Sequence, residues 1–492
     1  MHLTGFLRSQ GVAVEQCDLS IKVVRDVLVE YGGDEAEELL ELLGGDAPAE
    51  AKVEASGVID ELALWIRDNA DPAFGFSRYD ERLGAAAPFS EVERAVNRRG
   101  VIDGPLERHL EAAIARTRPT VIGVTCPFPG TLVASFKIAR YVRRRHPRIR
   151  LVLGGGFVST ELREMDNPRA MSYFDDFVFD EGYAAMAEIM GRKNVEVPPF
   201  VAPDYDGIDW SEYFDVVETE NPMHRLWSVG RWRKLVMARG CYWRKCAFCD
   251  VRLPYIGRFR MPDVAQIADA AERLGGDIHF VDEAMPPALV EKFSRELIRR
   301  KIRCSWWGNV RFDSGFTPKL ARLMAKAGCV AVTGGLECAN DRLLELMNKG
   351  ITLDSARRAL EAFRDAGIMV HAYLMYGFPT ETEKEAFGAL DFVRGLFREN
   401  LVQSAFWHRF ALTVHSPIAA DPERFGISAG RPPGRKGAVF RRNELAFEEP
   451  GAPDWDEIGK ALKLAMYNFM EGRGLGRKPL FWKKAVRFRH ER

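Results

Sequence analysis

The sequence lacks the features of secreted, membrane-spanning and polyanion-binding proteins. No window holds 18 uninterrupted apolar residues, so no segment is long enough to cross a bilayer as a helix. Residues 1–16 contain neither a charged stretch followed by a long apolar run nor a cleavage site, which argues against a secretory signal. Lys plus Arg and Asp plus Glu number 70 each, and this balance gives no support for a polyanionic partner.

Cysteine is also scarce, with eight residues in a chain of 492. This number is too small for a disulfide scaffold, and three of the eight lie close together in one loop. Such usage is typical of a reduced, soluble protein in which clustered cysteines bind metal. We therefore expect a cytoplasmic protein.

The first zone of the chain, residues 1–193, has an α/β pattern. Short β-branched runs at Thr120–Thr131 and Ile149–Thr160 end in Gly or Pro, and a third run begins near Asp175. Helical spacing fills the interval between the first two runs. Strand–helix–strand alternation predicts a Rossmann-like parallel sheet with ligands beyond the carboxyl ends of its strands. Residues 194–232 are rich in Pro, Asp and aromatics without a steady period, and we interpret them as a linker.

The second zone, residues 233–430, repeats the α/β pattern six times. The predicted strands cover residues 234–238, 277–281, 303–307, 330–334, 369–375 and 403–407. Helical segments separate the strands, and a Gly-rich or polar loop follows each strand. This rhythm predicts a partial (β/α)6 barrel whose active face is built by those loops.

Three cysteines follow the first of these six strands. Cys241, Cys246 and Cys249 have the spacing C-x4-C-x2-C. A closed tetrahedral zinc site needs a fourth ligand. A [4Fe–4S] cluster held by three thiolates instead leaves one iron open to a small molecule.

The cysteine motif after the first barrel strand resembles the signature of radical S-adenosylmethionine (radical SAM) enzymes, with one residue more than the usual C-x3-C-x2-C. The resemblance implies that SAM chelates the open iron and is cleaved reductively to a 5′-deoxyadenosyl radical. It also implies a one-electron reductant such as flavodoxin or ferredoxin.

The resemblance extends to residues expected near SAM. Phe248 matches the aromatic near the adenine, and the acidic residues after the second strand match groups that face the SAM amine. A Gly-Leu-Glu element follows the fourth strand and a Gly-Phe-Pro turn follows the fifth. The SAM-binding residues implied in this way are Phe248, Asp282, Glu283, Glu337, Gly377 and Pro379.

Polar and aromatic residues at the ends of the third and sixth predicted strands are further candidates for catalysis or substrate binding. They are Trp307, Asn309, Arg311, His408 and Arg409. Core packing for the tryptophan and an ordinary structural role for the histidine are the alternatives.

The first zone resembles the cobalamin-binding domain found before the barrel in B12-dependent radical SAM enzymes. Glycine lets the backbone approach a flat, bulky ligand because no Cβ intrudes. The candidate cobalamin residues are Thr125, Pro127, Pro129, Gly154, Gly155 and Gly156. Residues 3–20 predict a helix followed by the second strand of such a domain, so its usual first strand is missing. No D-x-H-x-x-G segment supplies a histidine for cobalt.

Three functions are possible: the resemblance implies the first two, and the clustered cysteines alone allow the third. The first is cobalamin-dependent methylation of an unreactive carbon or phosphorus in a small-molecule or peptide substrate. The second is a radical SAM rearrangement, cyclisation or oxidation without methyl transfer. The third is a non-catalytic binding module stabilised by zinc, with Cys304, Cys338 or His279 as the fourth ligand.

The C-terminal extension, residues 431–492, mixes basic residues with Phe481, Trp482 and Phe488. Interleaved basic and aromatic residues are found in nucleic-acid-binding segments. We favour an amphipathic helix docked on the barrel, and therefore expect no nucleic-acid partner.

Overall fold

The computed structural model describes residues 1–430 and 439–490, and it describes no side chains at 85–86 and 487–490. The chain divides into two compact units. Unit 1 contains Met1–Glu220, Ser228–Arg231 and residues 439–443, and unit 2 contains Asn221–Trp227, Trp232–Gly430 and Glu444–Arg492. The predicted linker is thus shared: residues 194–220 pack with unit 1, and residues 221–227 pack with unit 2.

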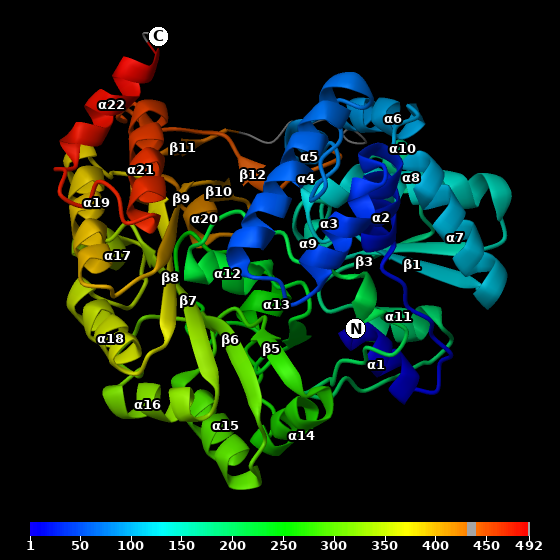
Figure 1. The fold of residues 1–492 in the computed structure, drawn as a ribbon, viewed down its shortest axis with the longest axis horizontal. Coiled ribbons are helices and arrows are strands. Elements are labelled where there is room, and N and C mark those ends of the chain that lie inside the picture. Colours follow the sequence, from blue (N-terminus) through cyan, green and yellow to red (C-terminus); the bar gives the residue numbers. More distant parts are fainter. Residues whose placement is uncertain (431–438, 491–492) are drawn as a thin grey trace. The chain divides into compact units, whose positions relative to one another are not determined.

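Unit 1 is built on a three-stranded parallel sheet in the order β1-β2-β3 (Figure 1). Its strands are β1 (Val121–Thr125), β2 (Arg150–Gly154) and β3 (Asp176–Val178). The larger helices of the unit are α1 (His2–Ser9), α2 (Leu19–Gly32), α3 (Glu35–Gly44), α4 (Ala49–Asn69), α5 (Glu81–Ala86), α6 (Phe89–Asn97), α7 (Asp103–Thr117), α8 (Leu132–Arg145) and α11 (Tyr183–Ile189). Shorter turns are η1 (Pro129–Thr131), α9 (Gly156–Thr160), α10 (Pro168–Met171) and η2 (Trp210–Glu212). The strands confirm the three runs predicted from the sequence.

Alternate residues of β2 bury on opposite faces of this sheet, as the period of a strand requires. Leu151 and Leu153 belong to the core that includes Phe136 of α8. Val152 belongs to a second core with Phe6 of α1 and Met186 of α11. Both faces of β2 are therefore covered by helices.

The prediction of a strand after the first helix is wrong. Residues 12–18 are neither helix nor strand, and α2 begins at Leu19. Side chains hold this segment: the Arg8 guanidinium donates to the Val14 carbonyl at 2.8 Å. The Gln16 amide donates to the Asp204 carbonyl at 2.8 Å and to the Asp206 carbonyl at 2.9 Å. These contacts replace strand pairing, and among the described residues β1 forms one edge of the sheet.

Unit 2 contains a six-stranded parallel sheet whose spatial order follows the chain. Its strands are β4 (Arg233–Leu235), β5 (Gly276–Phe280), β6 (Cys304–Val310), β7 (Cys329–Glu337), β8 (Met369–Tyr376) and β9 (Ser404–Arg409). All six predicted strands are confirmed. In the described chain β4 and β9 are the two edges of this sheet.

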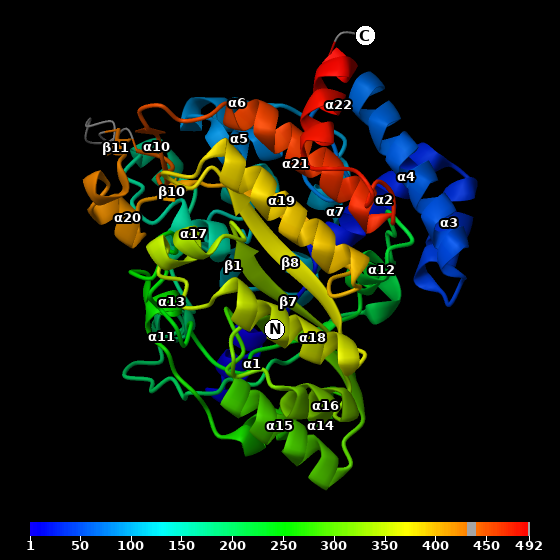
Figure 2. The same ribbon diagram turned by 90° about the vertical axis from the view of Figure 1, so that its left-hand side faces the viewer.

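The helices that connect these strands lie along one face of the sheet (Figures 1 and 2). They are α14 (Val264–Leu274), α15 (Pro287–Arg300), α16 (Pro318–Lys326), α18 (Leu353–Asp365) and α19 (Glu383–Arg398). Phe280 of β5 and Trp306 of β6 pack edge-on against Phe293 of α15, and all three side chains are fully buried. These apolar contacts bury the helix-covered face of the sheet. Polar groups are therefore expected on the opposite face and at the strand ends.

Smaller elements complete unit 2. They are α12 (Pro222–Ser228), α13 (Pro254–Gly257), α17 (Asp341–Leu346), β10 (Leu412–Thr413), α20 (Pro417–Ala420), η3 (Glu423–Phe425), β11 (Ser428–Ala429), β12 (Glu444–Leu445) and β13 (Phe447–Glu448). No helix in the described part of the chain is long and apolar enough to cross a membrane.

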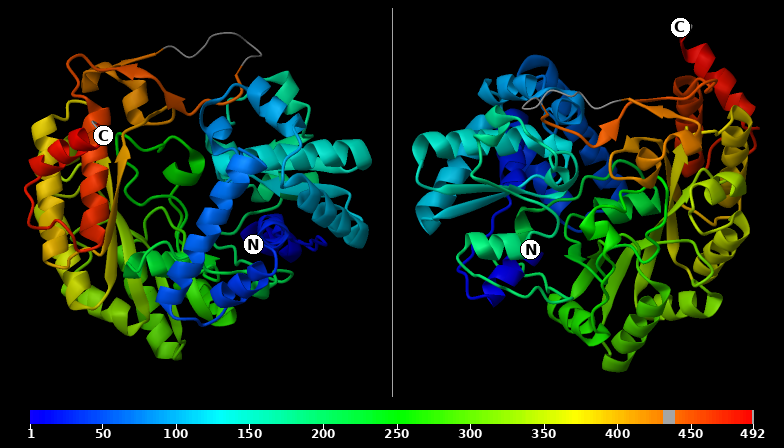
Figure 3. Two further views of the ribbon diagram at one scale, coloured as in Figure 1. Left: turned by 45° about the horizontal axis from the view of Figure 1, so that its top comes forward. Right: turned by 180° about the vertical axis from the view of Figure 1, so that it is seen from behind.

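The C-terminal helices α21 (Trp455–Met470) and α22 (Leu480–His490) dock on their own unit. Figure 3 shows α21 beside α19. Trp482 of α22 is buried, with its ring centroid 5.8 Å from that of Phe469 in α21. This is the docked helix expected from the sequence, although the Phe488 side chain lies outside the described residues.

Candidate active site

The three predicted metal ligands lie in the loop that leaves the carboxyl end of β4. Backbone hydrogen bonds hold this loop, from the Cys241 N–H to the Ile256 carbonyl at 2.9 Å and from the Ala247 N–H to the Met347 carbonyl at 2.8 Å. Cys246 is buried, and Cys241 and Cys249 are partly exposed. The loop therefore presents thiols while its backbone stays fixed.

Two cations lie beside the cysteine loop. Arg311, at the end of β6, places Nη1 3.9 Å from the Cys246 sulfur and packs over the Trp243 ring. Burial raises the pKa of the Cys246 thiol, while Lys349 and Arg311 oppose that rise. Cations of this kind suit thiolate ligands because they stabilise the deprotonated sulfur.

The three thiols share one electrostatic environment. Burial is the main cause that raises the pKa of the Cys249 thiol, and the charges of Cys246, Glu283, Asp250 and Cys241 raise it further. A metal that binds these thiols would remove that cost, because it coordinates the deprotonated form.

The three thiols suit a cluster, and the other candidate zinc ligands lie or make contacts elsewhere. Among the described residues, no group of three or more His, Cys, Asp or Glu side chains is close enough to hold one metal ion. A cubane distributes its ligands over different irons, so three thiolates need not converge on one point. Cys304 begins β6 and so lies at the opposite end of the parallel sheet, and the His279 ring stacks on Trp307 at 3.6 Å. The Cys338 thiol donates to Glu381 at 3.8 Å.

Of the two acidic residues after β5, Asp282 shapes the backbone. Its carboxylate accepts hydrogen bonds from the Met237 N–H at 2.8 Å and the Ala238 N–H at 2.6 Å. Burial raises the pKa of Asp282 to about 7, and these two hydrogen bonds oppose the rise. Glu283 is exposed at its surface, burial of its carboxyl raises its own pKa, and its charge raises the pKa of the Cys249 thiol.

Glu337 forms a buried ion pair at the end of β7. Its Oε1 lies 2.5 Å from Lys349 Nζ, and Glu337 adopts a left-handed backbone with φ 55°. Lys349 Nζ also lies 5.7 Å from the centroid of the Phe248 ring. The structure therefore brings Phe248 and Glu337 to one cation. No sequence motif pointed to Lys349, which follows a short helix in an ordinary turn.

The turn after β8 depends on Glu381. Its carboxylate accepts hydrogen bonds from the Gly377 N–H at 2.6 Å and the Phe378 N–H at 3.2 Å. Burial is the main cause that raises the pKa of Glu381 to about 8. Gly377 has φ 75° and Pro379 is buried, so both predicted residues belong to this ordered turn.

The candidates at the strand ends separate into two groups. Arg311 lies beside Cys246, and the Asn309 amide donates to the Asp282 carbonyl at 2.9 Å. Trp307 packs in the aromatic stack with His279. His408 and Arg409 are exposed, and Arg409 pairs with Asp456 at 2.7 Å.

The candidate cobalamin residues lie at the carboxyl ends of β1 and β2. The Cys126 N–H donates to the Gly154 carbonyl at 2.8 Å, so the two strand ends stay paired. A Cβ on Gly155 would lie 2.5 Å from the Cys126 carbonyl oxygen, at φ 115°. The close approach of two loops of the protein therefore requires glycine at position 155. The expected approach of a ligand is a second reason for glycine there.

The outer surface of these loops is open to solvent. Thr125 and Gly156 are exposed, and the Phe128 side chain is 69% exposed. This edge presents backbone groups and one aromatic ring to solvent. Ligands of open α/β sheets bind at such edges.

Comparison with known proteins identifies the class of unit 2. Residues 235–393 match the family model described as the radical SAM superfamily, so unit 2 contains a radical SAM domain. In fold, the chain is similar to the radical SAM methyltransferase TsrM from Kitasatospora setae, at TM-score 0.51 and 18% identity over 74% of this chain and 81% of that one. It is also similar to the cobalamin-dependent radical SAM enzyme OxsB, at TM-score 0.51 and 16% identity over 74% of this chain and 60% of that one.

Relatives by sequence include enzymes of two kinds. An anaerobic magnesium-protoporphyrin IX monomethyl ester cyclase of Rubrivivax gelatinosus is 29% identical over 37% of this chain and 32% of its own. An uncharacterised methyltransferase of Pyrococcus horikoshii is 24% identical over 60% of this chain and 69% of its own. The chain therefore spans about a third of the cyclase and about two thirds of the methyltransferase.

Proposed function

We propose that this protein is a cobalamin-dependent radical SAM methyltransferase. The observation that carries the proposal is the position of the cysteine loop. It follows the first strand of a six-stranded parallel sheet in a radical SAM domain and lies beside Arg311 and Lys349. When bound, the [4Fe–4S] cluster supplies one electron to cleave SAM, and cobalamin supplies the methyl carrier.

The protein's own groups perform the remaining tasks. Cys241, Cys246 and Cys249 would hold the cluster as thiolates, and Arg311 would stabilise the charge of Cys246. Glu283 receives the ammonium group of SAM, because it is an exposed acidic residue whose charge raises the pKa of the Cys249 thiol. Glu381 shapes the turn after β8.

The region around Lys349 recognises the rest of SAM. Lys349 holds Glu337 in place, so that its second carboxylate oxygen and the Phe248 ring are available to the ribose and the adenine. A carboxylate that accepts ribose hydroxyls needs a fixed orientation, and the buried ion pair provides it.

The proposal of a cobalamin cofactor is supported by the named relatives and by the exposed edge of unit 1. The TsrM and OxsB structures are described with cobalamin bound. Another relative, 26% identical over 30% of this chain, is the bacteriochlorophyllide d C-12(1)-methyltransferase of Chlorobaculum tepidum. We place the corrinoid at the loops that contain Thr125, Pro127, Pro129 and residues 154–156.

A second candidate function is radical cyclisation without methyl transfer. It is favoured by the Rubrivivax relative and by a relative with the same name in Cereibacter sphaeroides, 22% identical over 56% of this chain. For either function we propose a small-molecule or peptide substrate, a one-electron reductant such as flavodoxin or ferredoxin, and a cytoplasmic location. The TsrM structure described with its tryptophan substrate supports a small molecule.

Methyl-labelled SAM separates the two functions. The protein is reconstituted anaerobically with iron, sulfide and hydroxocobalamin, reduced, and supplied with the small-molecule fraction of a lysate. The proposal predicts that label enters a product and that 5′-deoxyadenosine forms. Formation of 5′-deoxyadenosine without label transfer supports cyclisation or another radical outcome instead.

Two variants control this experiment. Cys249→Ala should abolish 5′-deoxyadenosine formation because it removes a cluster ligand. Cys304→Ala, which changes a cysteine at the opposite end of the sheet, should leave it unchanged. Equal activity in both variants would contradict the assignment of the cluster ligands.

A further inference from the structure

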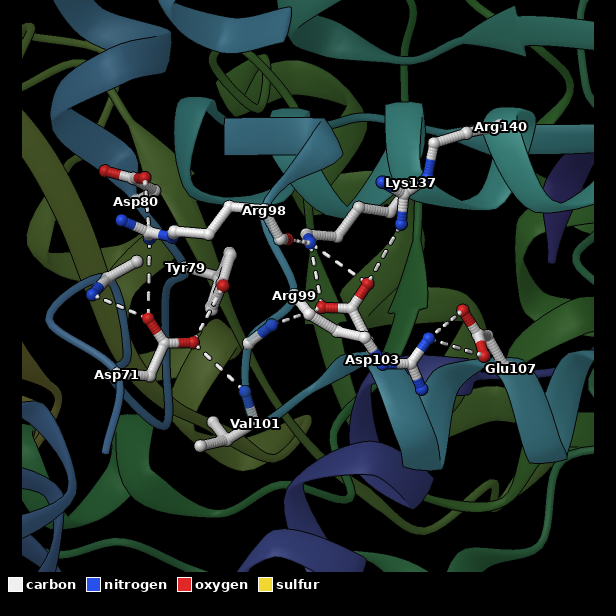
Figure 4. A network of polar contacts seen from close by, with 12 residues as sticks. Asp71, Tyr79, Asp80, Arg98, Arg99, Val101, Asp103, Glu107, Lys137 and Arg140 are labelled. Atoms are coloured by element: carbon white, nitrogen blue, oxygen red, sulfur yellow. Dashed lines mark hydrogen bonds and ion pairs between the residues drawn. The ribbon is translucent and has the colours of Figure 1, made fainter. Parts of the chain in front are cut away.

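A buried network of polar side chains in unit 1 links the segment after α4 to the start of α7 and to α8 (Figure 4). At its centre the Asp71 carboxylate, 2% exposed, accepts hydrogen bonds from the Tyr79 hydroxyl at 2.8 Å and the Val101 N–H at 3.1 Å. The Arg98 guanidinium also donates to Asp71, at 3.4 Å, and lies 3.8 Å from Asp80. One buried carboxylate therefore joins three segments of the chain.

A second carboxylate connects the network to α8. Asp103 lies 2.8 Å from Lys137 Nζ and 3.3 Å from the Arg140 guanidinium. Lys137 Nζ also donates to the Arg98 carbonyl at 2.6 Å. Burial lowers the pKa of Lys137, and the Asp103 carboxylate opposes this effect. The pair thus fixes the first half of α8, directly after the loop that follows β1.

The network reaches that loop through Tyr79. The Tyr79 backbone N–H donates to the Gly130 carbonyl at 3.0 Å. The approach is close, since a Cβ on Gly130 would lie 2.7 Å from the Arg78 Cβ. A Cβ on Gly84 would lie 2.6 Å from the Pro129 carbonyl oxygen. Residues 78–84 therefore lie directly against the loop of residues 126–131, and Tyr79 contacts both the loop and Asp71.

The other side of the same loop is held by the end of β2. The Phe157 N–H lies within hydrogen-bonding distance of the Cys126 carbonyl, at 3.2 Å, and of the Pro127 carbonyl, at 3.1 Å. The loop of residues 126–131 is thus fixed between residues 78–84 and the turn after β2. A network that served stability alone could be replaced by apolar side chains at little cost. This network meets the loop through the Tyr79 backbone, and the Tyr79 hydroxyl bond to Asp71 fixes where that backbone lies.

We propose that Asp71 and Tyr79 are positioning residues for the corrinoid, because they hold the loop of residues 126–131 in the shape that receives it. The inference rests on the proposed cobalamin dependence. No sequence motif indicated a role for residues 70–103. In this proposal they support the cofactor loop.

The test compares Asp71→Asn and Tyr79→Phe with Lys52→Met in the full chain. Lys52 forms a buried pair with Asp215 at 2.8 Å elsewhere in unit 1, so its loss destabilises the unit without touching the loop. Hydrogen exchange is measured first, without corrinoid, on the peptide with the amides of Phe128, Gly130 and Thr131. Hydroxocobalamin binding is then titrated by absorbance.

We expect exchange of the loop peptide to become about tenfold faster in Asp71→Asn, and hydroxocobalamin to bind about tenfold more weakly. Tyr79→Phe, which removes one hydroxyl, should change both quantities in the same direction by less. Lys52→Met should lower the melting temperature and leave both quantities at the wild-type level.

Wild-type exchange of the loop in Asp71→Asn and Tyr79→Phe would overturn the inference, as would equal acceleration in Lys52→Met. A wild-type protein that binds no hydroxocobalamin would contradict the proposed function. The exchange comparison would still decide whether Asp71 and Tyr79 hold the loop.

Discussion

The guanidinium of Arg311 lies 3.9 Å from the sulfur of Cys246, and both side chains are buried. A fixed positive charge at this distance stabilises the more negative, reduced state of a cluster bound there. We expect Arg311→Met to lower the midpoint potential of the reconstituted cluster by tens of millivolts, on the order set by one nearby charge. Arg311→Lys, which keeps the charge, should retain most of the wild-type potential.

Redox titration followed by electron paramagnetic resonance measures this effect. An unchanged potential in Arg311→Met, with full iron content, would show that Arg311 does not act on the cluster.

The Glu337–Lys349 pair predicts strong coupling between two substitutions. Lys349→Met leaves the Glu337 carboxylate buried without its cation, which costs about 3–5 kcal/mol of unfolding free energy. The double variant Glu337→Gln, Lys349→Met removes both charges and should recover most of that loss. Denaturant unfolding of the apoprotein measures both values.

An exposed pair provides the control. Arg358→Met breaks the pair of Arg358 with Asp354 on α18 and should leave the unfolding free energy close to that of the wild type. Additive effects of the Glu337 and Lys349 substitutions would contradict a coupled pair.

Glu381 predicts a dependence of stability on pH. Burial raises its pKa from the ordinary value near 4.5 to about 8, so the folded protein holds a proton that the unfolded chain releases. The stabilisation from Glu381 is fully present below its ordinary pKa and is lost as the pH rises toward 8. Above that pH the contribution does not change further. Glu381→Gln cannot ionise, so its stability relative to the wild type should increase between these limits.

Glu385, in the first turn of α19, has the opposite behaviour. Its hydrogen bonds to Arg342 lower its pKa to about 2, so its stabilisation is present above the ordinary pKa and is lost as the pH falls toward 2. Unfolding measured across pH should therefore separate Glu385→Gln from Glu381→Gln. Parallel profiles of the two variants would refute the raised pKa of Glu381.

Gly350 predicts a steric effect on the cysteine loop. A Cβ at this position would lie 2.0 Å from the Trp243 ring, and φ is 73°. Gly350→Ala should therefore displace Trp243, lower the unfolding free energy by about 2–4 kcal/mol and reduce iron retention. Gly367→Ala is the matched control, because φ is 75° there and no atom lies within 4 Å of the added Cβ. Similar losses in both variants would show that only backbone strain matters.

Local pattern predicted the repeating part of the fold. Each of the six strands of unit 2 is a β-branched or aromatic run that ends at Gly or a polar loop, and such runs are recognisable without tertiary information. The spacing of Cys241, Cys246 and Cys249 identified the loop because the three residues are neighbours in the chain.

Contacts between distant segments were not predictable in this way. Lys349 belongs to the site only because its segment folds back onto the end of β7, where it pairs with Glu337. Asp71 accepts a hydrogen bond from the Val101 N–H, although 30 positions separate the two residues. The segment of residues 12–18 resembled a strand, but side-chain hydrogen bonds from Arg8 and Gln16 hold it outside the sheet. Tertiary contacts of this kind override the local propensity for a strand.

The central claim is that three cysteines hold an iron–sulfur cluster with one iron open to SAM. Its most direct test is electron paramagnetic resonance of the anaerobically reconstituted, reduced protein before and after addition of SAM. The account predicts about four irons per chain, a [4Fe–4S] signal that changes when SAM is added, and loss of that signal in Cys249→Ala. A colourless protein with a single zinc ion enclosed by four side chains would contradict it.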